Sequence, residues 1–302
     1  MSILFTGAHA AAVTPSRPDS FQMDLASALE VIDFLCANKV KGIAVFGATG
    51  EFPHFTVEDR IRLTHMCIKR SRVPVLVNVT HSCFTDAVAM ADHAAQNGAA
   101  AVMVQPPHYF RYAAGEIREY MLRFIQEVNG AIPVLLYNLP AFNNAIPIEV
   151  SRELLEDGSA AGIKDSSGDW SYMAALLESR KKREFPLLVG NDTLTARGRA
   201  AGADGCVSGC ACAVPELLVA LDEATVAGKT EQAARLSALL DEFIGWVVKF
   251  PGPAAVKEGV AVRGIKIGAR AVPFSPETER VAAEYREWFK GWLPSMQQAC
   301  RG

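Results

Sequence analysis

The segment Ile132-Pro133-Val134-Leu135-Leu136-Tyr137-Asn138-Leu139-Pro140 is a short apolar run that ends in polar and turn-forming residues. Such a run, bounded by proline and asparagine, is typical of a buried β-strand. A segment with helical periodicity precedes it, over Gly115 to Val128, and a second apolar run that ends in Lys164 follows it. Strands that alternate with helices predict βα units and a parallel sheet.

The same pattern recurs about every 30 residues along the chain. Helical spacing separates the runs, as in Asp24 to Ala37, Val57 to Arg70, Phe84 to Asn97 and Ser171 to Ser179. Eight alternating strands and helices over this length predict a closed (β/α)8 barrel, the TIM barrel fold. The predicted strands are His9 to Val13, Gly42 to Phe46, Val75 to Asn78, Ala100 to Val104, Pro133 to Tyr137, Gly162 to Lys164, Leu187 to Gly190 and Gly205 to Ser208.

The competing α/β fold is a doubly wound open sheet, which usually carries a glycine fingerprint after its first strand. Here Val13-Thr14-Pro15-Ser16 occupies that position, so the fingerprint is absent. We interpret Glu216 to Ala227 as the eighth barrel helix. Three further helical segments follow, Glu231 to Val248, Ala254 to Arg263 and Pro276 to Trp292. We therefore expect a catalytic barrel over residues 1–228 and a helical carboxy-terminal extension over residues 229–302.

Composition limits the class of partner. The chain has 302 residues and a formal net charge of −3, with 30 basic and 33 acidic side chains, so we expect no nucleic-acid partner. The seven cysteines lie mostly in apolar stretches and indicate reduced core residues. Residues 1–15 lack the basic flank of a signal peptide and lead into the first strand, and no apolar stretch is long enough to cross a membrane. We expect a cytoplasmic protein without a membrane partner.

Barrel enzymes carry their active sites at the carboxyl ends of the strands. The sixth run places Lys164 there, followed by Asp165-Ser166-Ser167-Gly168. Burial disfavours an ammonium ion, and a neutral amine is the nucleophile that attacks a ketone. The alternative is a lysine that reaches water or pairs with Asp165.

Two neighbouring strand ends support a functional interpretation. Period-two alternation places Tyr137 on the same face as Leu135, which could be the barrel interior, and a phenol there can shuttle protons. It could equally be a core tyrosine bonded to the backbone. After the second strand, Gly47-Ala48-Thr49-Gly50-Glu51 forms a small-residue turn, whose free backbone N–H groups and Thr49 hydroxyl suit a carboxylate.

Together these stretches resemble the dihydrodipicolinate synthase and N-acetylneuraminate lyase family of lysine-dependent pyruvate aldolases. The resemblance implies that Lys164 forms a Schiff base with a 2-oxo acid, that Tyr137 transfers protons, and that no cofactor is needed. It implies that Thr49 and the Ala48 backbone hold the substrate carboxylate. It also implies a homotetramer, a dimer of dimers, in which Tyr109 reaches into a neighbouring site. The segments that carry it are Thr14-Pro15, residues 47–51, Pro106-Pro107-His108-Tyr109-Phe110, Tyr137-Asn138-Leu139-Pro140, Gly162-Ile163-Lys164-Asp165 and residues 205–209, where Val207 would line the pyruvate pocket.

Some positions depart from the synthases of this family. They resemble one another in having a hydroxyl residue at the position of Ala48, which links two tyrosines in a proton relay, and an arginine shortly after the Tyr-Asn-x-Pro motif. Here Phe142 lies in that stretch and cannot form a charged pair. Gly190, Phe142 and His108 are predicted to line the substrate pocket. The stretch Lys164-Asp165-Ser166-Ser167-Gly168-Asp169 looks closer to family members that cleave a 2-keto-3-deoxy sugar acid or a 4-hydroxy-2-oxo acid, so the resemblance favours retro-aldol cleavage of such a substrate. Condensation of pyruvate with aspartate semialdehyde is the alternative.

The sequence gives less support to functions of other classes. The six histidines include no His-x-His or His-x-x-x-His pair, so we expect no catalytic metal. A phosphate site after the seventh and eighth strands would bring the phosphate close to Asp192, which would repel it. A non-catalytic pyruvate sensor that keeps Lys164 remains a further alternative.

Overall fold

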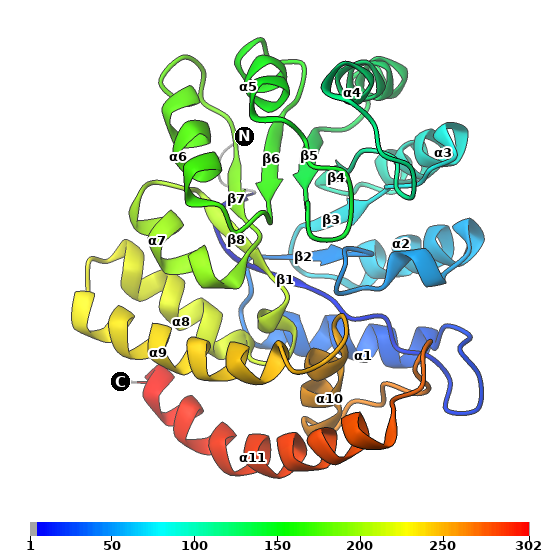
Figure 1. Ribbon diagram of the computed structural model, residues 1–302. Coiled ribbons are helices and arrows are strands. Elements are labelled where there is room, and N and C mark those ends of the chain that lie inside the picture. The colour runs from blue at the N-terminus through cyan, green and yellow to red at the C-terminus, as the bar shows by residue number, and fades with distance from the viewer. Residues whose placement is uncertain (1–4, 302) are drawn as a thin grey trace.

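Eight parallel strands close into a barrel in the order β1 to β8, and β8 pairs with β1. The computed structural model describes residues 5–301, so residues 1–4 and 302 of the predicted domains lie outside the described residues. Figure 1 shows the helices surrounding the strands. The predicted TIM barrel is confirmed. The strands are β1 (Gly7–Ala11), β2 (Gly42–Val45), β3 (Val75–Asn78), β4 (Ala101–Val104), β5 (Val134–Asn138), β6 (Gly162–Asp165), β7 (Leu187–Val189) and β8 (Gly205–Ser208).

Each strand is followed by a helix on the outside of the barrel, and side-chain caps fix several helix starts. Asp24 accepts hydrogen bonds from the Ala26 and Ser27 amides, and Thr56 accepts one from the Asp59 amide. The barrel helices are α1 (Leu25–Ala37), α2 (Val57–Arg70), α3 (Phe84–Gln96), α4 (Ala114–Val128), α5 (Ile148–Glu156), α6 (Trp170–Ser179), α7 (Thr195–Ala200) and α8 (Pro215–Val226).

Three further helices follow the barrel, namely α9 (Thr230–Val247), α10 (Ala254–Val262) and α11 (Pro276–Arg301). α9 and α11 contact α8, α10 contacts α9 and α11 (Figure 1), and aromatic rings hold α9 against α11. The ring centroids of Phe243 and Trp292, for example, lie 6.0 Å apart. No helix within residues 5–301 is long and apolar enough to cross a membrane.

Predicted and observed boundaries differ at a few ends. β1 spans Gly7–Ala11 rather than residues 9–13, because its pairing with β8 begins at Gly7 and its ladder with β2 ends at Ala11. The last helix continues from Trp292 to Arg301 with Pro294 inside it. A proline removes one helical hydrogen bond but does not end every helix. Met296, which follows the proline, is buried in the apolar core, so its packing favours the continued helix.

The barrel interior is a separate apolar cluster from the layer between strands and helices. It contains Leu135 and Tyr137 of β5 together with Leu188 and Val207. The predicted alternation of β5 is therefore confirmed, since Tyr137 shares the inward face with Leu135. Both side chains are almost completely buried.

Candidate active site

Lys164 and Tyr137 face one another across neighbouring strands. They are paired residues in the β5–β6 register, and the Lys164 Nζ lies 4.2 Å from the centroid of the Tyr137 ring. Only 3% of Lys164 and 2% of Tyr137 is exposed. Among the described residues, Lys164 has no hydrogen bond or ion pair with a carboxylate, and Asp165 instead bonds Asn138 and Ser167. The predicted alternative of a Lys164–Asp165 pair is thus wrong.

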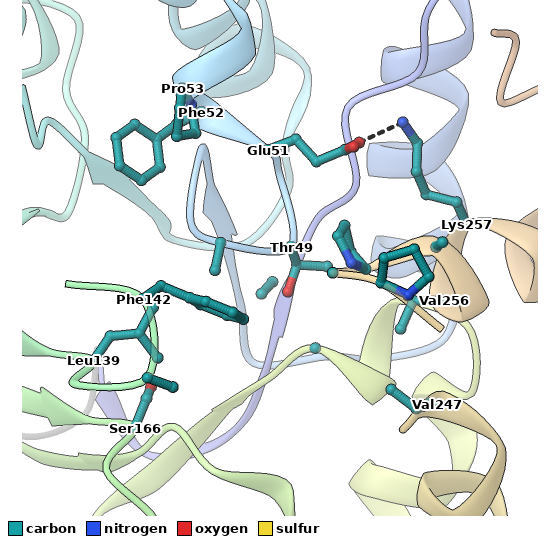
Figure 2. Close-up of a pocket in the computed structure, with 18 of the residues that line it drawn as sticks. Thr49, Glu51, Phe52, Pro53, Leu139, Phe142, Ser166, Val247, Val256 and Lys257 are labelled. Carbon is teal, nitrogen blue, oxygen red and sulfur yellow. Dashed lines mark hydrogen bonds and ion pairs between the residues drawn. The ribbon is translucent and has the colours of Figure 1, made fainter. Parts of the chain in front are cut away.

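A cavity of about 750 Å³ opens above these two residues. It reaches from the barrel mouth to the carboxy-terminal helices, and Figure 2 shows Thr49, Phe142 and Ser166 around it with Val247 and Val256 on the far side. Eight of the nine predicted site positions line it. They are Ala48, Thr49, His108, Tyr137, Phe142, Lys164, Gly190 and Val207.

Tyr109 is the ninth position and does not line the cavity. Its side chain is 89% exposed, and its backbone φ of 82° lies in the left-handed region that non-glycine residues seldom adopt. Phe110 beside it is 63% exposed. The two rings contact each other edge to face, with centroids 5.0 Å apart.

The turn after β2 supplies part of the predicted carboxylate nest. The Gly50 and Glu51 amides already donate to the carbonyls of Gly47 and Ala48, so that part of the expectation of free N–H groups is wrong. The Ala48 and Thr49 amides donate to no acceptor in residues 5–301. Two amides and the Thr49 hydroxyl therefore remain available to an anion at the cavity wall.

Gly190 lies against the lysine. A Cβ added there would meet the Ser166 Oγ at 2.0 Å and the Lys164 Cε at 2.9 Å, both closer than real Cβ contacts. Only a glycine leaves this space to Lys164. The Gly190 N donates to the Asp165 carbonyl, which extends the β6–β7 pairing and holds Gly190 beside Lys164.

Three polar atoms at the cavity wall are buried and have no hydrogen-bond partner among the described residues. They are the Ser166 Oγ, the Gln105 Nε2 and the His108 Nδ1. Buried polar groups are usually paired, so unpaired groups in one cavity point to a polar ligand. Desolvation, followed by the charges of His81 and Arg60, lowers the pKa of His108 and favours its neutral ring.

Ser166, Gln105 and Asp192 were not among the predicted site residues. Ser166 follows Lys164 by two positions in the quoted strand-end motif, which is the signal that could have indicated it. Asp192 accepts a hydrogen bond from the Ser208 hydroxyl. Burial raises the pKa of the Asp192 carboxyl above its ordinary value, and the charge of Lys164 opposes only part of this rise. Gln105 is positioned by Asn143, whose Nδ2 donates to its Oε1 at 3.0 Å.

The other cations of the cavity wall are already paired with carboxylates. Lys257 of α10 pairs with Glu51, as Figure 2 shows, and Arg270 pairs with Glu258 and Glu279. Histidines aside, Lys164 is the one unpaired cationic side chain that lines the cavity within residues 5–301. Within the described residues, the cavity thus offers one amine nucleophile and no free lysine or arginine besides it for a second carboxylate.

Comparisons with known proteins identify the family. The sequence model of the dihydrodipicolinate synthetase family matches residues 4–290. A 4-hydroxy-tetrahydrodipicolinate synthase of Methanosarcina barkeri is 26% identical over 94% of this chain and 98% of its own length. A DapA-like lyase of Halobacterium salinarum is 31% identical over 81% of both chains.

Solved structures show the same fold. The dihydrodipicolinate synthase of Aquifex aeolicus superposes with a TM-score of 0.86 at 25% identity, over 96% of this chain and 98% of that one. A sialic acid aldolase of Ruminococcus gnavus shares the fold with a TM-score of 0.86 at 22% identity, over 97% and 99% of the two chains. The chain therefore belongs to the dihydrodipicolinate synthetase family of lyases.

Proposed function

We propose that this protein is a class I aldolase that cleaves a 4-hydroxy-2-oxo acid, such as a 2-keto-3-deoxy sugar acid, into pyruvate and an aldehyde. The observation that carries the proposal is the position of Lys164, whose amine is buried at the barrel mouth without a carboxylate partner. A buried, unpaired amine beside a phenol suits Schiff-base chemistry at a ketone.

In the proposed reaction, the Lys164 Nζ attacks the C2 carbonyl of the substrate and water leaves as the imine forms. The phenol of Tyr137 gives its proton to the departing hydroxyl, which leaves the imine as an iminium and Tyr137 as a phenolate. The phenolate then takes the proton of the C4 hydroxyl, the C3–C4 bond breaks, and its electron pair moves into the iminium to give an enamine. The aldehyde departs, C3 accepts a proton, and water releases pyruvate from the lysine. The substrate carboxylate would bind the Ala48 and Thr49 amides and the Thr49 hydroxyl.

The unpaired polar atoms support a hydroxylated substrate. Ser166, Gln105 and His108 line the cavity, and each carries a buried polar atom without a partner within residues 5–301; side-chain rotation would let substrate hydroxyls complete these hydrogen bonds. Phe142 at the rim is 71% exposed and would contact the aldehyde half. Val207 and Gly190 would border the pyruvate half.

Condensation of pyruvate with aspartate semialdehyde is the second candidate, favoured by the names of the Methanosarcina and Aquifex relatives. The cavity argues against it for this chain. Phe142 offers no cation, Lys257 and Arg270 are paired, and Ala48 cannot carry a proton between tyrosines. A non-catalytic sensor would bind pyruvate through the same lysine, so only a turnover assay would distinguish it from a lyase.

The first test is covalent trapping. Borohydride reduction in the presence of pyruvate should add one reduced pyruvate to the chain, at Lys164, by mass spectrometry. Lys164→Ala should abolish the adduct with the fold intact, and Lys164→Arg should not restore it because a guanidinium stays protonated. Lys290→Met changes an exposed lysine outside the cavity and should keep the adduct. Trapping that persists in Lys164→Ala would refute the mechanism.

The second arm measures turnover on a panel of 2-keto-3-deoxy acids and 4-hydroxy-2-oxo acids by coupled detection of pyruvate, with aspartate semialdehyde plus pyruvate alongside. We expect pyruvate release from a panel member and no appreciable condensation. Condensation with a kcat in the ordinary range of ~1 to 10³ per second would make the protein a synthase. An adduct without turnover on any substrate would make it a sensor.

A further inference from the structure

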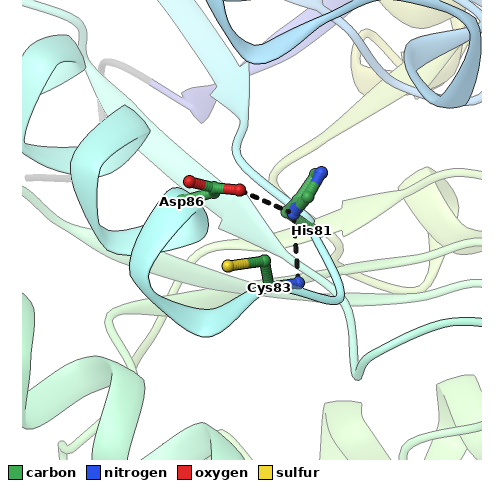
Figure 3. Close-up of side chains that lie close together, drawn as sticks. All are labelled: His81, Cys83 and Asp86. Carbon is green, nitrogen blue, oxygen red and sulfur yellow. Dashed lines mark hydrogen bonds and ion pairs between the residues drawn. The ribbon is translucent and has the colours of Figure 1, made fainter.

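A second cluster of chemically reactive side chains lies away from the cavity, at the turn between β3 and α3. It consists of His81, Cys83 and Asp86, which we call the β3–α3 cluster (Figure 3). One ligand atom from each residue, an imidazole nitrogen, a thiol sulfur and a carboxylate oxygen, lies within 4.8 Å of the other two. None of the three residues lines the catalytic cavity.

The hydrogen bonds of this cluster leave two acceptor atoms close together without a proton between them, and a cation could bind both. The Cys83 amide donates to the His81 Nδ1 at 3.0 Å, so this nitrogen carries no proton. The Asp86 Oδ2 lies 3.5 Å from the same nitrogen. This distance is too long for a good hydrogen bond, and both atoms are acceptors, so neither can donate to the other. Two acceptors and a thiol therefore lie within 4.8 Å of one another, and within residues 5–301 the only donor to the two acceptors is a backbone amide.

The distances and the ligand types fit zinc. Zn²⁺ binds histidine nitrogen, thiolate and carboxylate at about 2.0 to 2.3 Å, so two ligand atoms of a tetrahedral site lie about 3.3 to 3.7 Å apart. The separation of 3.5 Å between the His81 Nδ1 and the Asp86 Oδ2 is such an edge. Cys83 is exposed, and its sulfur contacts the Thr85 hydroxyl at 3.2 Å, so it can turn toward the ion.

We propose that the β3–α3 cluster is a Zn²⁺ site with three protein ligands, His81, Cys83 and Asp86, and water in the remaining position. Binding releases the thiol proton to solvent and exchanges the amide contact of the His81 Nδ1 for the metal. The spacing His-x-Cys-x-x-Asp differs from the histidine pairs sought for a catalytic metal. This site is separate from the Schiff-base chemistry and does not depend on the proposed function.

The position of the cluster gives the ion a structural role behind the cavity wall. The His81 ring packs edge to face on the ring of His108, with centroids 6.4 Å apart. Ser82, between His81 and Cys83 in the chain, donates to the His108 carbonyl at 2.9 Å and accepts from its amide at 3.1 Å. An ion bound only to the folded turn stabilises the native state.

The test uses the full chain after treatment with a chelator, and Co²⁺ as a spectroscopic probe. We expect one Co²⁺ per chain with the absorption band of a cobalt–thiolate bond, displaced by Zn²⁺, and a rise in Tm with Zn²⁺. Cys83→Ser should remove the band, and His81→Ala and Asp86→Asn should each weaken Zn²⁺ binding by at least about tenfold. Cys36→Ser, which changes another cysteine that is not fully buried, should keep the band and the Tm shift.

Two results would overturn the site. One is the absence of both the thiolate band and stoichiometric Zn²⁺ on equilibrium dialysis of the parent chain. The other is an unchanged affinity for Zn²⁺ in a Cys83→Ser variant that circular dichroism shows to be folded. The borohydride test of Lys164 is independent of both, because it needs no metal.

Discussion

At the scale of single residues, the proposed chemistry depends on the phenol of Tyr137. Its ring lies against the Lys164 amine and its side chain is 2% exposed. If its hydroxyl transfers protons, Tyr137→Phe keeps the ring packing but lowers the rate of the chemical step by roughly 10²- to 10⁴-fold. Substrate affinity should change far less. Single-turnover rates and Tm, measured on one preparation, test this.

The opposite balance would remove Tyr137 from the mechanism. If Tyr137 served only the core, Tyr137→Phe would change stability by on the order of 1 kcal/mol and leave turnover near normal. Full activity in a destabilised Tyr137→Phe variant is that outcome.

Gly190 provides a test of the space around the lysine. The Cβ of Gly190→Ala would lie 2.9 Å from the Lys164 Cε and 2.0 Å from the Ser166 Oγ. We expect the displaced lysine to lose most pyruvate trapping while the chain still folds, as circular dichroism would show. Gly291→Ala is the control, since a Cβ there meets nothing within 4 Å. Undiminished trapping in Gly190→Ala would show that Lys164 tolerates displacement.

At the scale of elements, a buried ion pair joins the turn after β2 to α10. The side chains of Glu51 and Lys257 are 14% and 5% exposed, and Figure 2 shows them reaching toward one another. Removing one partner strands a buried charge, so Glu51→Gln and Lys257→Met should each lower the free energy of unfolding by ~3 to 5 kcal/mol. The double variant should recover much of this loss.

A double-mutant cycle by chemical denaturation measures the coupling between Glu51 and Lys257. The exposed pair of Lys290 and Glu287 on α11 is the reference, and we expect its coupling to stay within about 0.2 to 1 kcal/mol. Additive losses at Glu51 and Lys257 would mean that α10 is held to the barrel by packing alone.

At the scale of the whole molecule, the exposed aromatic residues Tyr109 and Phe110 lie at the barrel mouth beside the loop of His108. The strained φ of Tyr109 and its 89% exposure suit a side chain that a second copy of the chain covers. We propose a homotetramer in which Tyr109 completes a neighbouring site. The division into a barrel (residues 1–228) and an extension (residues 229–302) stays a prediction.

Replacing the aromatic ring tests the assembly. Tyr109→Ala should reduce the molar mass measured by light scattering at low protein concentration and lower kcat as well. Val226→Ser, which changes another exposed hydrophobic residue, should do neither. A monomeric parent chain, or Tyr109→Ala with unchanged mass and activity, would contradict the proposed assembly.

The sequence by itself determined the barrel, because the period of its apolar runs is a local property. Each run from Gly42 to Ser208 that was predicted as a strand is a strand to within one residue at either end. Inward alternation also placed Tyr137, since the side-chain period of a strand is two. The strand-end position of Lys164 followed from the same local pattern.

Only the tertiary structure decided which groups meet in the cavity. Ser166, Gln105 and Lys257 come from three distant parts of the chain, and no local pattern reports that they line one space. Lys257 pairs with Glu51, 206 residues away. Because of this pairing, Lys257 is not free to bind a second carboxylate in the cavity. The β3–α3 cluster likewise depends on how the turn folds His81 back toward Asp86. Charge pairing and unpaired polar atoms are properties of three-dimensional neighbours, so they become visible only when the barrel has closed.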